Sequence, residues 1–503
     1  MIQRIDRRTR AALHDVGATR RIEQTAAASL PPHTLMQRAG LAVARLTQAV
    51  APHSRVVWVA CGPGNNGGDG LEAALQLHAQ WHRAIDTVVT WLGDPARASS
   101  DTLSALQRVR SAGIAISAEP PERWDCGIDA LLGIGAERAP AGVLAQHLVQ
   151  LRGGAAPLVC IDVPSALDAD TGHDFASALE ASPDAAPTSP RHCLSLLTLK
   201  PGLFTANGRD RAGTVWFDDL GCNCVAEPPA AMLPGAPDDH ARADAAHVSH
   251  KGSFGTVAVL GGASGMAGAA LLCASAALHA GAGRVLVGLL DRDAARLDPV
   301  QPELMLRDAA SLDIANSTVV AGCGGGDSGA DTVAAQLPRL LSNAPRLVLD
   351  ADALNAIARD AALQSLLRAR AARARPTVLT PHPLEAARLI GTDASAVQRD
   401  RFKAARDLAA RFACVVVLKG SGTLVAGPDA SISINPTGNA RLATAGTGDV
   451  LAGMIGAALA RGMAPDAAAR AAVWQHGALA DDWPANHRLT AGALARGSVP
   501  SAH

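Results

Sequence analysis

Short apolar runs alternate with longer stretches of helical spacing through the first half of the chain. Arg55–Cys61 (RVVWVAC) is apolar after its first residue, and Pro157–Pro164 and Gly213–Asp218 are similar short runs. Between the first two, Leu71–His82 places its apolar residues at helical intervals. Strands that alternate with helices form parallel sheets covered on both faces, so this pattern predicts an α/β domain.

The same alternation resumes at His250 and continues almost to the end of the chain. Helical spacing is clearest in Asp360–Arg373 and Ala394–Arg411. A second covered parallel sheet follows, and we therefore expect an α/β protein of two three-layer αβα domains. The strands predicted for the second domain are Gly255–Leu260, Arg284–Leu289, Ser317–Ala321, Arg346–Asp350, Pro376–Thr380 and Ala413–Lys419.

A proline-rich segment separates the two alternations. Val225–His247 combines four prolines with acidic and small residues, which is typical of a linker or domain boundary. Glu180–Arg191 is rich in Pro, Ser, Asp and Ala and predicts an exposed insertion loop. The last residues are rich in Gly, Ala and Ser, which predicts a disordered tail. The expected organisation is a domain at 1–224, a linker at 225–247, a domain at 248–490 and the tail at 491–503.

Charge and aromatic content exclude several classes of partner. Among 503 residues, Lys and Arg total 45 and Asp and Glu total 46, so the formal net charge is −1. This balance argues against a nucleic acid or an anionic membrane held by bulk charge. Aromatic residues make up 3% with no Tyr, so base-stacking platforms are not expected. The most apolar run, Met266–Gly283, contains His279 and three glycines and suits a buried helix better than a transmembrane one.

The N-terminus and the cysteines bear on the compartment. MIQRIDRRTR has no apolar segment after its charges, so it does not resemble a secretory signal. The nine cysteines are scattered without a CxxC pair, and only Cys222 and Cys224 lie close together. An odd, scattered set is typical of reduced thiols, so we expect a cytoplasmic protein.

Lysine is rare in this chain. There are four lysines against 41 arginines, so arginine serves wherever a generic positive charge suffices. A lysine is then more often chosen for its compact ammonium, which the planar guanidinium cannot replace. Three of the four, Lys200, Lys251 and Lys419, lie in glycine-bearing segments, whereas Lys403 does not. Chance remains the alternative explanation for so small a set.

A glycine-rich loop follows the first predicted strand. Cys61–Gly70 (CGPGNNGGDG) contains the GxGxxG spacing of a dinucleotide-binding Rossmann turn. Asn65, Asn66 and Asp69 also crowd the expected helix start with side-chain oxygens, which suit a cation or a hydroxyl as well as a pyrophosphate. The simpler alternative is a strand-to-helix turn with Asn and Asp capping.

Two further strand ends in this domain carry acids and glycines. They are Asp129–Gly135 (DALLGIG) and Ile161–Gly172 (IDVPSALDADTG). The carboxyl ends of parallel strands converge on one crevice, so these segments are expected to meet the glycine-rich loop. A single Asp at such a position is more often a helix cap, but three acidic segments together favour a site.

These segments make the first domain resemble the NAD(P)HX epimerase domain. They appear in that family's order and span most of residues 1–224. The matching segments are Leu35–Gly40 (LMQRAG), Gly62–Gly70 (GPGNNGGDG), Asp129–Gly135, Asp162–Gly172 (DVPSALDADTG) and Leu199–Leu203 (LKPGL).

The resemblance implies a Rossmann-like fold that interconverts the epimers at C6 of hydrated NADH or NADPH. It implies that Asp162 acts in the proton transfers, as a carboxylate beside the labile carbon can. It also implies a potassium ion bound by Asn66, Asp129 and Ser165, an oxygen-only set that suits a hard cation. The residues implied to contact the substrate are Asn65, Asn66, Gly67, Gly68, Asp69, Gly133, Ile134, Gly135, Ala136, Glu137, Arg138, Ala139 and Asp162.

Three positions depart from that family's pattern. Gln37 stands where Glu is usual, and Ala166 stands where Gly is usual. His192–Thr198 (HCLSLLT) matches poorly the apolar strand that usually precedes Lys-Pro-Gly. We expect these departures to leave the fold intact and to bear only on epimerase activity.

The most informative stretch of the second half is Asn435–Gly453, in which Gly446–Asp449 (GTGD) opens an apolar helix. Successive backbone N–H groups at a helix N-terminus form an anion site, and the glycines let a phosphate approach. Asp449 lies where it could take a proton from an attacking hydroxyl, although a simple cap or first-turn acid is the alternative. Leu418–Thr423 (LKGSGT) places a lysine beside two glycines at a strand end, which suits nucleotide phosphates.

Together with three other segments, these motifs resemble the ADP- or ATP-dependent NAD(P)HX dehydratase, a branch of the ribokinase-like superfamily. The other segments are HKG from His250, Leu349–Asn355 (LDADALN) and Thr380–Glu385 (TPHPLE). The resemblance implies nucleotide binding by Lys419, Gly420, Ser421, Gly422, Thr423 and Gly448, and hydrate binding by Ala269, Gly324, His382 and Asp449. Departures are Arg441 and Ala445 at usual Gly positions, Cys323 at a usual Pro and Met266 at a frequent Tyr.

The two resemblances predict a bifunctional repair enzyme for hydrated nicotinamide cofactors. The first domain would equilibrate the R and S hydrates of NADH or NADPH. The second would dehydrate the S hydrate with ADP or ATP, releasing phosphate and, from ADP, AMP. In this hypothesis Asp449 deprotonates the C6 hydroxyl, which attacks the terminal phosphoryl group. Phosphoryl transfer itself implies a divalent cation, Mg²⁺.

Two other classes of function remain open from the sequence. One is a ribokinase-like small-molecule kinase with a non-catalytic N-terminal domain, which would release a stable phosphorylated product. The other is a binding or scaffold role without turnover in the N-terminal domain. In each case we expect small-molecule ligands, a homo-oligomer, and neither nucleic acid nor membrane as partner.

Overall fold

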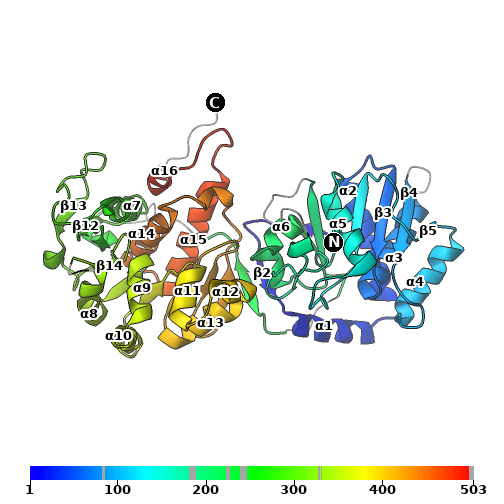
Figure 1. Cartoon of the computed structure of the whole chain (residues 1–503), viewed down its shortest axis with the longest axis horizontal. Coiled ribbons are helices and arrows are strands. Elements are labelled where there is room, and N and C mark those ends of the chain that lie inside the picture. Colours follow the sequence, from blue (N-terminus) through cyan, green and yellow to red (C-terminus); the bar gives the residue numbers. More distant parts are fainter. Residues whose placement is uncertain are drawn as a thin grey trace. The chain divides into compact units, whose positions relative to one another are not determined.

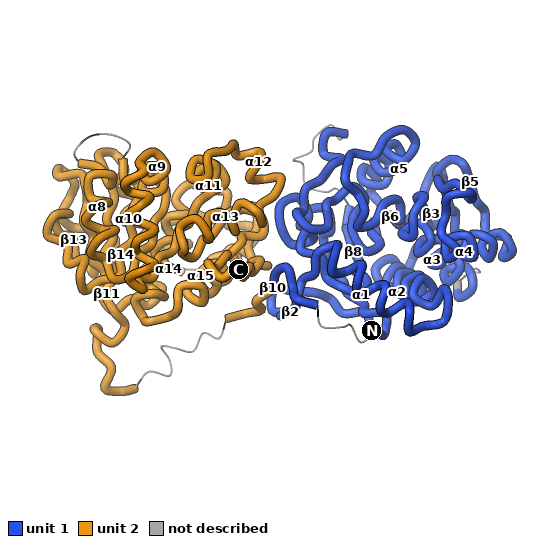
Figure 2. The backbone as a smooth tube through the Cα atoms, turned by 90° about the horizontal axis from the view of Figure 1, so that it is seen from below, with its two compact units in different colours: residues 1–232 blue, residues 233–503 orange. Residues whose placement is uncertain are grey.

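The chain folds into two compact units, residues 1–232 and 233–503, in the computed structural model (Figure 2). The structure describes residues 1–81, 85–179, 189–222, 227–237, 246–326, 329 and 331–497. The division falls inside the predicted linker, within the short strand β10 (Ala231–Pro234). Most of the predicted insertion loop, much of that linker and the last six residues of the predicted tail lie outside the described residues.

Unit 1 is built on one mostly parallel sheet (Figure 1). All its printed pairings are parallel except that of the edge strands β1 and β9. The three predicted strands are present, and His192–Thr198, which matched the family poorly, provides most of an ordinary internal strand, β8. In sheet order the strands are β1 (Gln3–Arg4), β9 (Thr214–Asp218), β8 (Arg191–Leu196), β7 (Leu158–Ile161), β6 (Cys126–Ala130), β3 (Val56–Cys61), β4 (Asp86–Trp91) and β5 (Ile116–Ser117).

Helices cover both faces of this sheet, as the apolar strands require. On one face α2, α3 and α4 pack together against the central strands, and α5 contacts β6 from the other. The core beneath α3 includes Val57, Val59 and Leu71, all fully buried. The helices are α1 (Val16–Ala28), α2 (Thr34–Val50), α3 (Asn65–Trp81), α4 (Ser100–Ser111), α5 (Gly142–Gly153) and α6 (Gly208–Ala212); the short strand β2 (Arg10–Leu13) precedes α1, and η1 (Ser177–Leu179) and η2 (Pro201–Phe204) are 3₁₀ turns.

Unit 2 is built on a second sheet, parallel from β13 to β17 and antiparallel beyond. All six predicted strands are present. In sheet order the strands within the unit are β13 (Met305–Asp308), β12 (Arg284–Leu289), β11 (Thr256–Gly261), β14 (Thr318–Ala321), β15 (Arg346–Leu349), β16 (Thr377–Leu379), β17 (Val415–Leu418), β18 (Leu424–Ala426) and β19 (Ile432–Ile434).

The helices of unit 2 form two groups, one on each face (Figure 1). Helices α7, α14, α15 and α16 pack with one another, and α8 to α13 form the second group. This confirms the expected three-layer αβα arrangement. The helices are α7 (Ala267–His279), α8 (Val333–Asn343), α9 (Ala351–Arg359), α10 (Ala361–Ala372), α11 (Pro383–Ile390), α12 (Ala394–Arg399), α13 (Arg401–Phe412), α14 (Thr447–Ala460), α15 (Pro465–Asp481) and α16 (Ala491–Ala495); η3 (Lys251–Phe254), η4 (Ala309–Ser311) and η5 (Ala440–Leu442) are 3₁₀ turns.

Two predictions for this unit are wrong in detail. The predicted helix at 394–411 is two helices, because Asp400 leaves the helical conformation and its carboxylate caps α13 by accepting from Lys403 N at 2.8 Å. The predicted disordered tail begins instead with α16, capped by Thr490 and anchored by the buried Leu494. The prediction of disorder rested on the small residues of this segment. In the structure those residues let α16 pack closely against α7.

The apolar run at 266–283 contains the 13-residue helix α7, and no helix in the described part of the chain has the length and hydropathy of a bilayer-spanning segment.

Candidate active sites

The glycine-rich loop of unit 1 opens a cavity of about 560 Å³ at the carboxyl ends of the parallel strands. The loop leaves β3 and turns at once into α3, so that a Cβ on Gly62 would lie 1.8 Å from Leu131 O and only glycine fits there. Helices α1 and α2 close the cavity from the other side. Of the predicted substrate contacts, the cavity is lined by Asn65, Asn66, Asp69, Gly133, Ile134, Gly135, Ala136 and Asp162.

The other predicted contacts of unit 1 are placed differently. Gly67 and Gly68 are buried behind the turn, where a Cβ on Gly67 would lie 2.1 Å from Gly62 O. Glu137, Arg138 and Ala139 are exposed and are not among the residues that line the cavity. The turn therefore explains the two glycines structurally, and only the first part of the loop at 133–139 reaches the cavity.

Asp162 follows β7 directly and is held by an unusual set of contacts. Its φ of 64° is in the left-handed region, which few residues other than Gly, Asn and Asp adopt. Its Oδ1 accepts hydrogen bonds from Leu196 N at 2.9 Å and from the ammonium of Lys200. The Asp162 side chain is 16% exposed, and that surface belongs to the cavity. The structure thus places a carboxyl group, anchored through one oxygen, on the cavity wall.

The three residues predicted to bind potassium lie together beside the cavity, joined through Leu132. Asn66 Nδ2 donates to Leu132 O at 3.1 Å, and Ser165 Oγ accepts from Leu132 N at 2.7 Å. Asp129 Oδ1 accepts from Ser165 Oγ at 2.5 Å, and its Oδ2 accepts from Ser165 N at 2.9 Å. The donor set is entirely oxygen and largely buried, so it fits a hard cation.

Two acidic groups share the cavity wall with Asp162. Burial and the neighbouring carboxylates of Asp162 and Glu23 raise the pKa of Asp69 well above its usual value. Burial, and then Asp162, raise the pKa of Glu23 as well, although its side chain opens onto the cavity. Glu23 comes from α1, and nothing in the spacing of the motifs pointed to it. Lys200 did carry a signal, because it is one of the chain's four lysines.

The departure at Ala166 has a structural consequence. Ala166 is fully buried and has a φ of 65°, a conformation that glycine adopts without cost. The loop nevertheless keeps its fold, because the adjacent Ser165 is bound by Asp129 and its carbonyl oxygen accepts from Arg152 Nη2 at 2.8 Å. The substitution therefore adds local strain without displacing Ser165.

In unit 2, the GTGD segment forms the start of α14, as predicted. Gly446 is the N-cap with a φ of 92°, and Asp449 lies in the first turn. His476 donates from Nε2 to Thr447 O at 2.9 Å, and burial lowers its pKa to about 4, so it holds this turn as a neutral group. A Cβ on Gly448 would lie 3.4 Å from Lys419 Nζ. The helix start and the predicted nucleotide loop therefore face one another.

Lys419 is the centre of a charged cluster at the carboxyl ends of β15, β16 and β17. Its Nζ lies 2.7 Å from Asp350 Oδ1 and 3.9 Å from Glu385 Oε2. Burial lowers the pKa of Lys419, but the two carboxylates more than offset this, so the pKa lies above its usual value. Burial raises the pKa of Glu385 to about 7, with Lys419 opposing the shift. No role was predicted for Asp350 or Glu385 from the sequence, although they lie in the motifs LDADALN and TPHPLE.

The loop at 419–423 joins β17 to β18, and Arg401 binds the backbone where the loop begins. The Arg401 guanidinium is buried and donates to Leu418 O at 3.1 Å and to Lys419 O at 3.2 Å. Thr423 Oγ1 donates back to Gly420 O at 3.0 Å. The predicted nucleotide residues Lys419, Gly420, Ser421, Gly422 and Thr423 thus form one short turn whose backbone is fixed.

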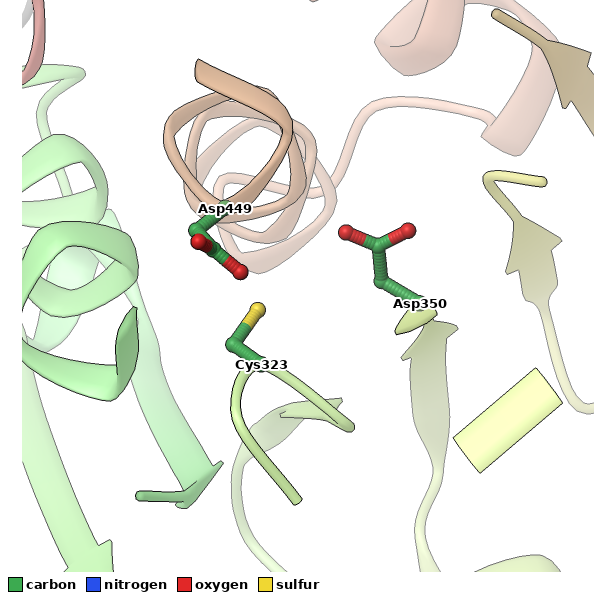
Figure 3. A group of neighbouring side chains, drawn as sticks. All are labelled: Cys323, Asp350 and Asp449. Carbon is green, nitrogen blue, oxygen red and sulfur yellow. The ribbon is translucent and has the colours of Figure 1, made fainter. Parts of the chain in front are cut away.

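Asp449 is the predicted catalytic carboxylate of this unit. Burial, and then Asp350, raise its pKa to about 6, while a hydrogen bond from the Cys323 thiol and the charge of Lys419 oppose the shift. Figure 3 shows Asp449 at the start of α14, with Cys323 below it and Asp350 across the gap at the end of β15. A group with this pKa is ionised at neutral pH and can still accept a proton readily.

The donor atoms of Cys323, Asp350 and Asp449 all lie within 4.8 Å of one another, which raises the question of a metal ion. Their chemistry does not favour one. A hydrogen bond with Cys273, together with burial, raises the pKa of the Cys323 thiol well above its usual value, so it stays protonated. Asp350 Oδ1 is already engaged by Lys419. A thiol is also a poor ligand for Mg²⁺, which takes oxygen.

The other residues predicted to bind the hydrate come from three further segments of unit 2. Gly324 lies against α7, where its Cβ would be 3.1 Å from that of Ala269. His382 is the N-cap of α11, and its Nδ1 accepts from Leu384 N at 3.1 Å and from Glu385 N at 3.3 Å. Burial, and then Lys419, lower the pKa of His382, and the Nε2 of its neutral ring lies 3.2 Å from Glu385 Oε1.

Comparisons with known proteins find a separate match for each of the two units. Residues 257–497 match the family model described as NAD(P)H-hydrate dehydratase, and residues 32–202 match that of the YjeF-related protein N-terminus. The chain is 46% identical over 260 residues to the ADP-dependent (S)-NAD(P)H-hydrate dehydratase of Neisseria meningitidis serogroup B, covering 50% of this chain and 86% of the relative. A crystal structure of the ADP/ATP-dependent NAD(P)H-hydrate dehydratase from Bacillus subtilis, co-crystallised with ATP/Mg²⁺, is 30% identical and covers 52% of this chain and 94% of that one, with a TM-score of 0.42.

Similarity also extends across both units. The bifunctional NAD(P)H-hydrate repair enzyme Nnr of Escherichia coli (strain K12) is 35% identical over 462 residues, which is 89% of this chain and 85% of the relative. Its counterpart in Vibrio cholerae is 35% identical over 459 residues, covering 89% of this chain and 88% of the relative. The chain therefore belongs to the family of bifunctional NAD(P)H-hydrate repair enzymes.

Proposed function

We propose that this protein repairs hydrated NADH and NADPH at two separate sites, one in each unit. Unit 1 equilibrates the R and S epimers at C6, and unit 2 dehydrates the S epimer with ADP or ATP. The observation that carries the proposal is the placement of Asp162 and Asp449. Each is a carboxylate at the carboxyl edge of its own parallel sheet, where open α/β sheets bind ligands.

In unit 1, Asp162 takes the proton of the C6 hydroxyl as the bond between C6 and the ring nitrogen breaks, which gives an open-chain aldehyde and lets the nitrogen take up a proton from solvent. The nitrogen then loses that proton and closes on the other face of the aldehyde, and Asp162 returns the proton to the oxygen, so that the configuration of C6 inverts. The surrounding cavity of about 560 Å³ is large enough to take a nicotinamide ring with part of its ribose phosphate. Potassium would be held by Asn66, Asp129 and Ser165, where its positive charge would stabilise a bound phosphate. The all-oxygen donor set supports this assignment.

In unit 2, Asp449 takes the proton of the C6 hydroxyl as that oxygen attacks the terminal phosphorus of the nucleotide. The bond between this phosphorus and the bridging oxygen breaks, leaving AMP from ADP or ADP from ATP. Phosphate then leaves C6 as the ring nitrogen donates its electron pair, and loss of the C5 proton to solvent restores the dihydronicotinamide. Lys419, the loop at 420–423 and Gly448 bind the phosphates by charge and by backbone N–H groups.

Mg²⁺ would enter with the nucleotide and neutralise its phosphates during transfer. The ATP/Mg²⁺ in the Bacillus subtilis dehydratase crystals is consistent with that route. Ala269, Gly324 and His382 would position the hydrate against Asp449.

One assay tests the dehydratase step. Purified protein is mixed with S-NADHX, Mg²⁺ and either ADP or ATP, and the appearance of NADH absorbance and phosphate is followed. We expect NADH and phosphate in equal amounts. Absence of NADH with both nucleotides would show the proposal to be wrong, and a stable phosphorylated product would favour the kinase alternative.

A second assay tests unit 1 and its cation. Pure R-NADHX is incubated without nucleotide, and the S epimer is measured by chromatography in potassium and in tetramethylammonium buffers. We expect exchange in potassium and a marked loss without it. Binding of the hydrate without exchange in either buffer would favour the scaffold alternative.

A further inference from the structure

The ammonium group of Lys200 is fully buried at the floor of the unit 1 cavity. Its Nζ donates to Leu196 O at 2.7 Å, to Thr198 O at 3.0 Å and to Oδ1 of Asp162. An ammonium has three N–H groups, so all of them are used. Burying a cation is costly unless it is paired and hydrogen-bonded, so this lysine is bound in one fixed place.

The same contacts divide the two oxygens of the Asp162 carboxylate. Oδ1 accepts from Lys200 and from Leu196 N, whereas within the described part of the chain no hydrogen bond engages Oδ2. The backbone of Asp162 is also tied to β8, because its N–H donates to Leu194 O at 2.8 Å. One oxygen is therefore anchored, and the other is left for a ligand in the cavity that Asp162 lines.

We propose that Lys200 is a positioning residue of the epimerase site, which anchors Oδ1 of Asp162 and so makes Oδ2 the oxygen that exchanges the proton with the substrate. This inference rests on the proposed function of unit 1. Lys200 itself does not touch the substrate, because its surface is covered. Pro201, at the first position of η2, fixes the backbone direction directly after the lysine.

The charge of Lys200 matters as much as its geometry. The groups that face Asp162 are the acidic side chains of Glu23 on α1 and Asp69 on α3, together with the thiol of Cys193 on β8, whose pKa burial raises well above its usual value. Lys200 supplies the opposing positive charge, and Arg20 lines the same cavity near Glu23. Without Lys200, the Asp162 carboxylate would face Glu23 and Asp69 without the cation that binds it.

The test compares Lys200→Met with Lys200→Arg in the full-length protein. We expect Lys200→Met to lower kcat for epimer exchange by roughly two orders of magnitude with a smaller change in KM, and to move the acid limb of the pH profile upward by about one unit. Lys200→Arg should keep that limb in place, because the charge remains. It should still lower kcat, since a planar guanidinium cannot reproduce three converging donors.

Controls separate this inference from loss of fold and from the proposed function. Dehydration of S-NADHX in unit 2 should be unchanged in both variants, and Lys403→Met, which removes an exposed lysine, should alter neither activity. If Lys200→Met does not fold, the kcat and pH profile of epimer exchange in Lys200→Arg provide the test. Wild-type kcat and pH profile in a folded variant, with only a lower melting temperature, would overturn the inference. Absence of epimer exchange in the wild type would instead refute the proposed function.

Discussion

Each unit pairs a lysine with an aspartate at its site, but only in unit 1 is that aspartate the predicted catalytic group. In unit 1, Lys200 binds Asp162, the predicted catalytic group itself. In unit 2, Lys419 binds Asp350 at 2.7 Å, and no lysine among the described residues forms an ion pair with Asp449. Two of the chain's four lysines are used in this way. In both places a lysine, which is rare in this chain, presents a compact ammonium group to a carboxylate, as the scarcity of lysine suggested.

The difference changes the electrostatics of the two bases. Asp162 is anchored by a cation, whereas the pKa of Asp449 is raised to about 6 by burial and by the charge of Asp350. Since Lys419 is only partly exposed and lies against Gly448, it can serve the nucleotide phosphates while its pairing with Asp350 offsets its buried charge. In the proposed mechanism, a Lys–Asp ion pair therefore orients the base of unit 1, and another Lys–Asp ion pair forms part of the anion site of unit 2.

The largest effect is expected from replacing Asp162, the carboxylate that Lys200 binds in unit 1. Asp162→Asn keeps the side chain's size but removes the proton acceptor, so epimer exchange should slow by roughly two to four orders of magnitude. Dehydration of pure S hydrate should be unaffected, because Asp449 lies in the other unit. Measuring both rates on one preparation checks the prediction, and an equal loss of both would contradict the two-site model.

Asp449→Asn is the reciprocal change. Dehydration should fall by roughly two orders of magnitude or more at similar nucleotide affinity, because Lys419 and the loop at 420–423 are intact. The raised pKa means that the carboxylate favours folding at low pH and loses that contribution as pH rises through about 6, so Asn should not lower the melting temperature at alkaline pH. Dehydration at the wild-type rate would reduce Asp449 to a first-turn acid of α14.

The pH dependence of dehydration tests how the neighbours of Asp449 set its pKa. Asp449 must be ionised to act, so activity should fall as pH drops through about 6. The charged and titratable groups that act on it are Asp350, Asp352, Lys419 and Cys323. Asp350→Asn removes an acidic neighbour and leaves Lys419 unneutralised, so the acid limb should move down by about one unit.

The pH profile of kcat for the variant and the wild type measures this shift. Asp407→Asn, which alters a half-exposed carboxylate on α13, is the matched control and should leave the limb in place. A limb that stays in place in Asp350→Asn would mean that burial alone sets the pKa of Asp449.

The smallest expected effect concerns Cys323, which replaces a usual proline. Cys323→Ala removes the thiol that bonds Asp449, so the acid limb of dehydration should rise by a few tenths of a unit and kcat should fall a few-fold. Cys323→Ser keeps a donor and should restore most of the loss. Cys414→Ala, at a buried cysteine whose pKa is raised by burial and influenced by Arg370 but not by Asp449, serves as the control.

Local patterns predicted much of this molecule. The predicted strands are all present because buried parallel strands must be apolar, and such runs are visible in the sequence. The GTGD segment likewise predicted the start of a helix, because glycine directly before an apolar helical stretch is typical of a helix N-terminus. Capping was less visible: Asp400 divides one predicted helix into two because its carboxylate bonds the backbone of α13.

The motifs, and the strand end to which each one belongs, can be identified from the sequence alone. The tertiary structure alone decided which charged groups share a cavity: Glu23 joins Asp162 from α1, and Glu385 joins Lys419 from α11. These contacts depend on how the helices pack at the carboxyl ends of the strands. The spacing of residues along the chain does not reveal that packing. The pKa of Asp449 is likewise a property of burial and of Asp350, about a hundred residues away in sequence, because electrostatic interaction depends on distance in space.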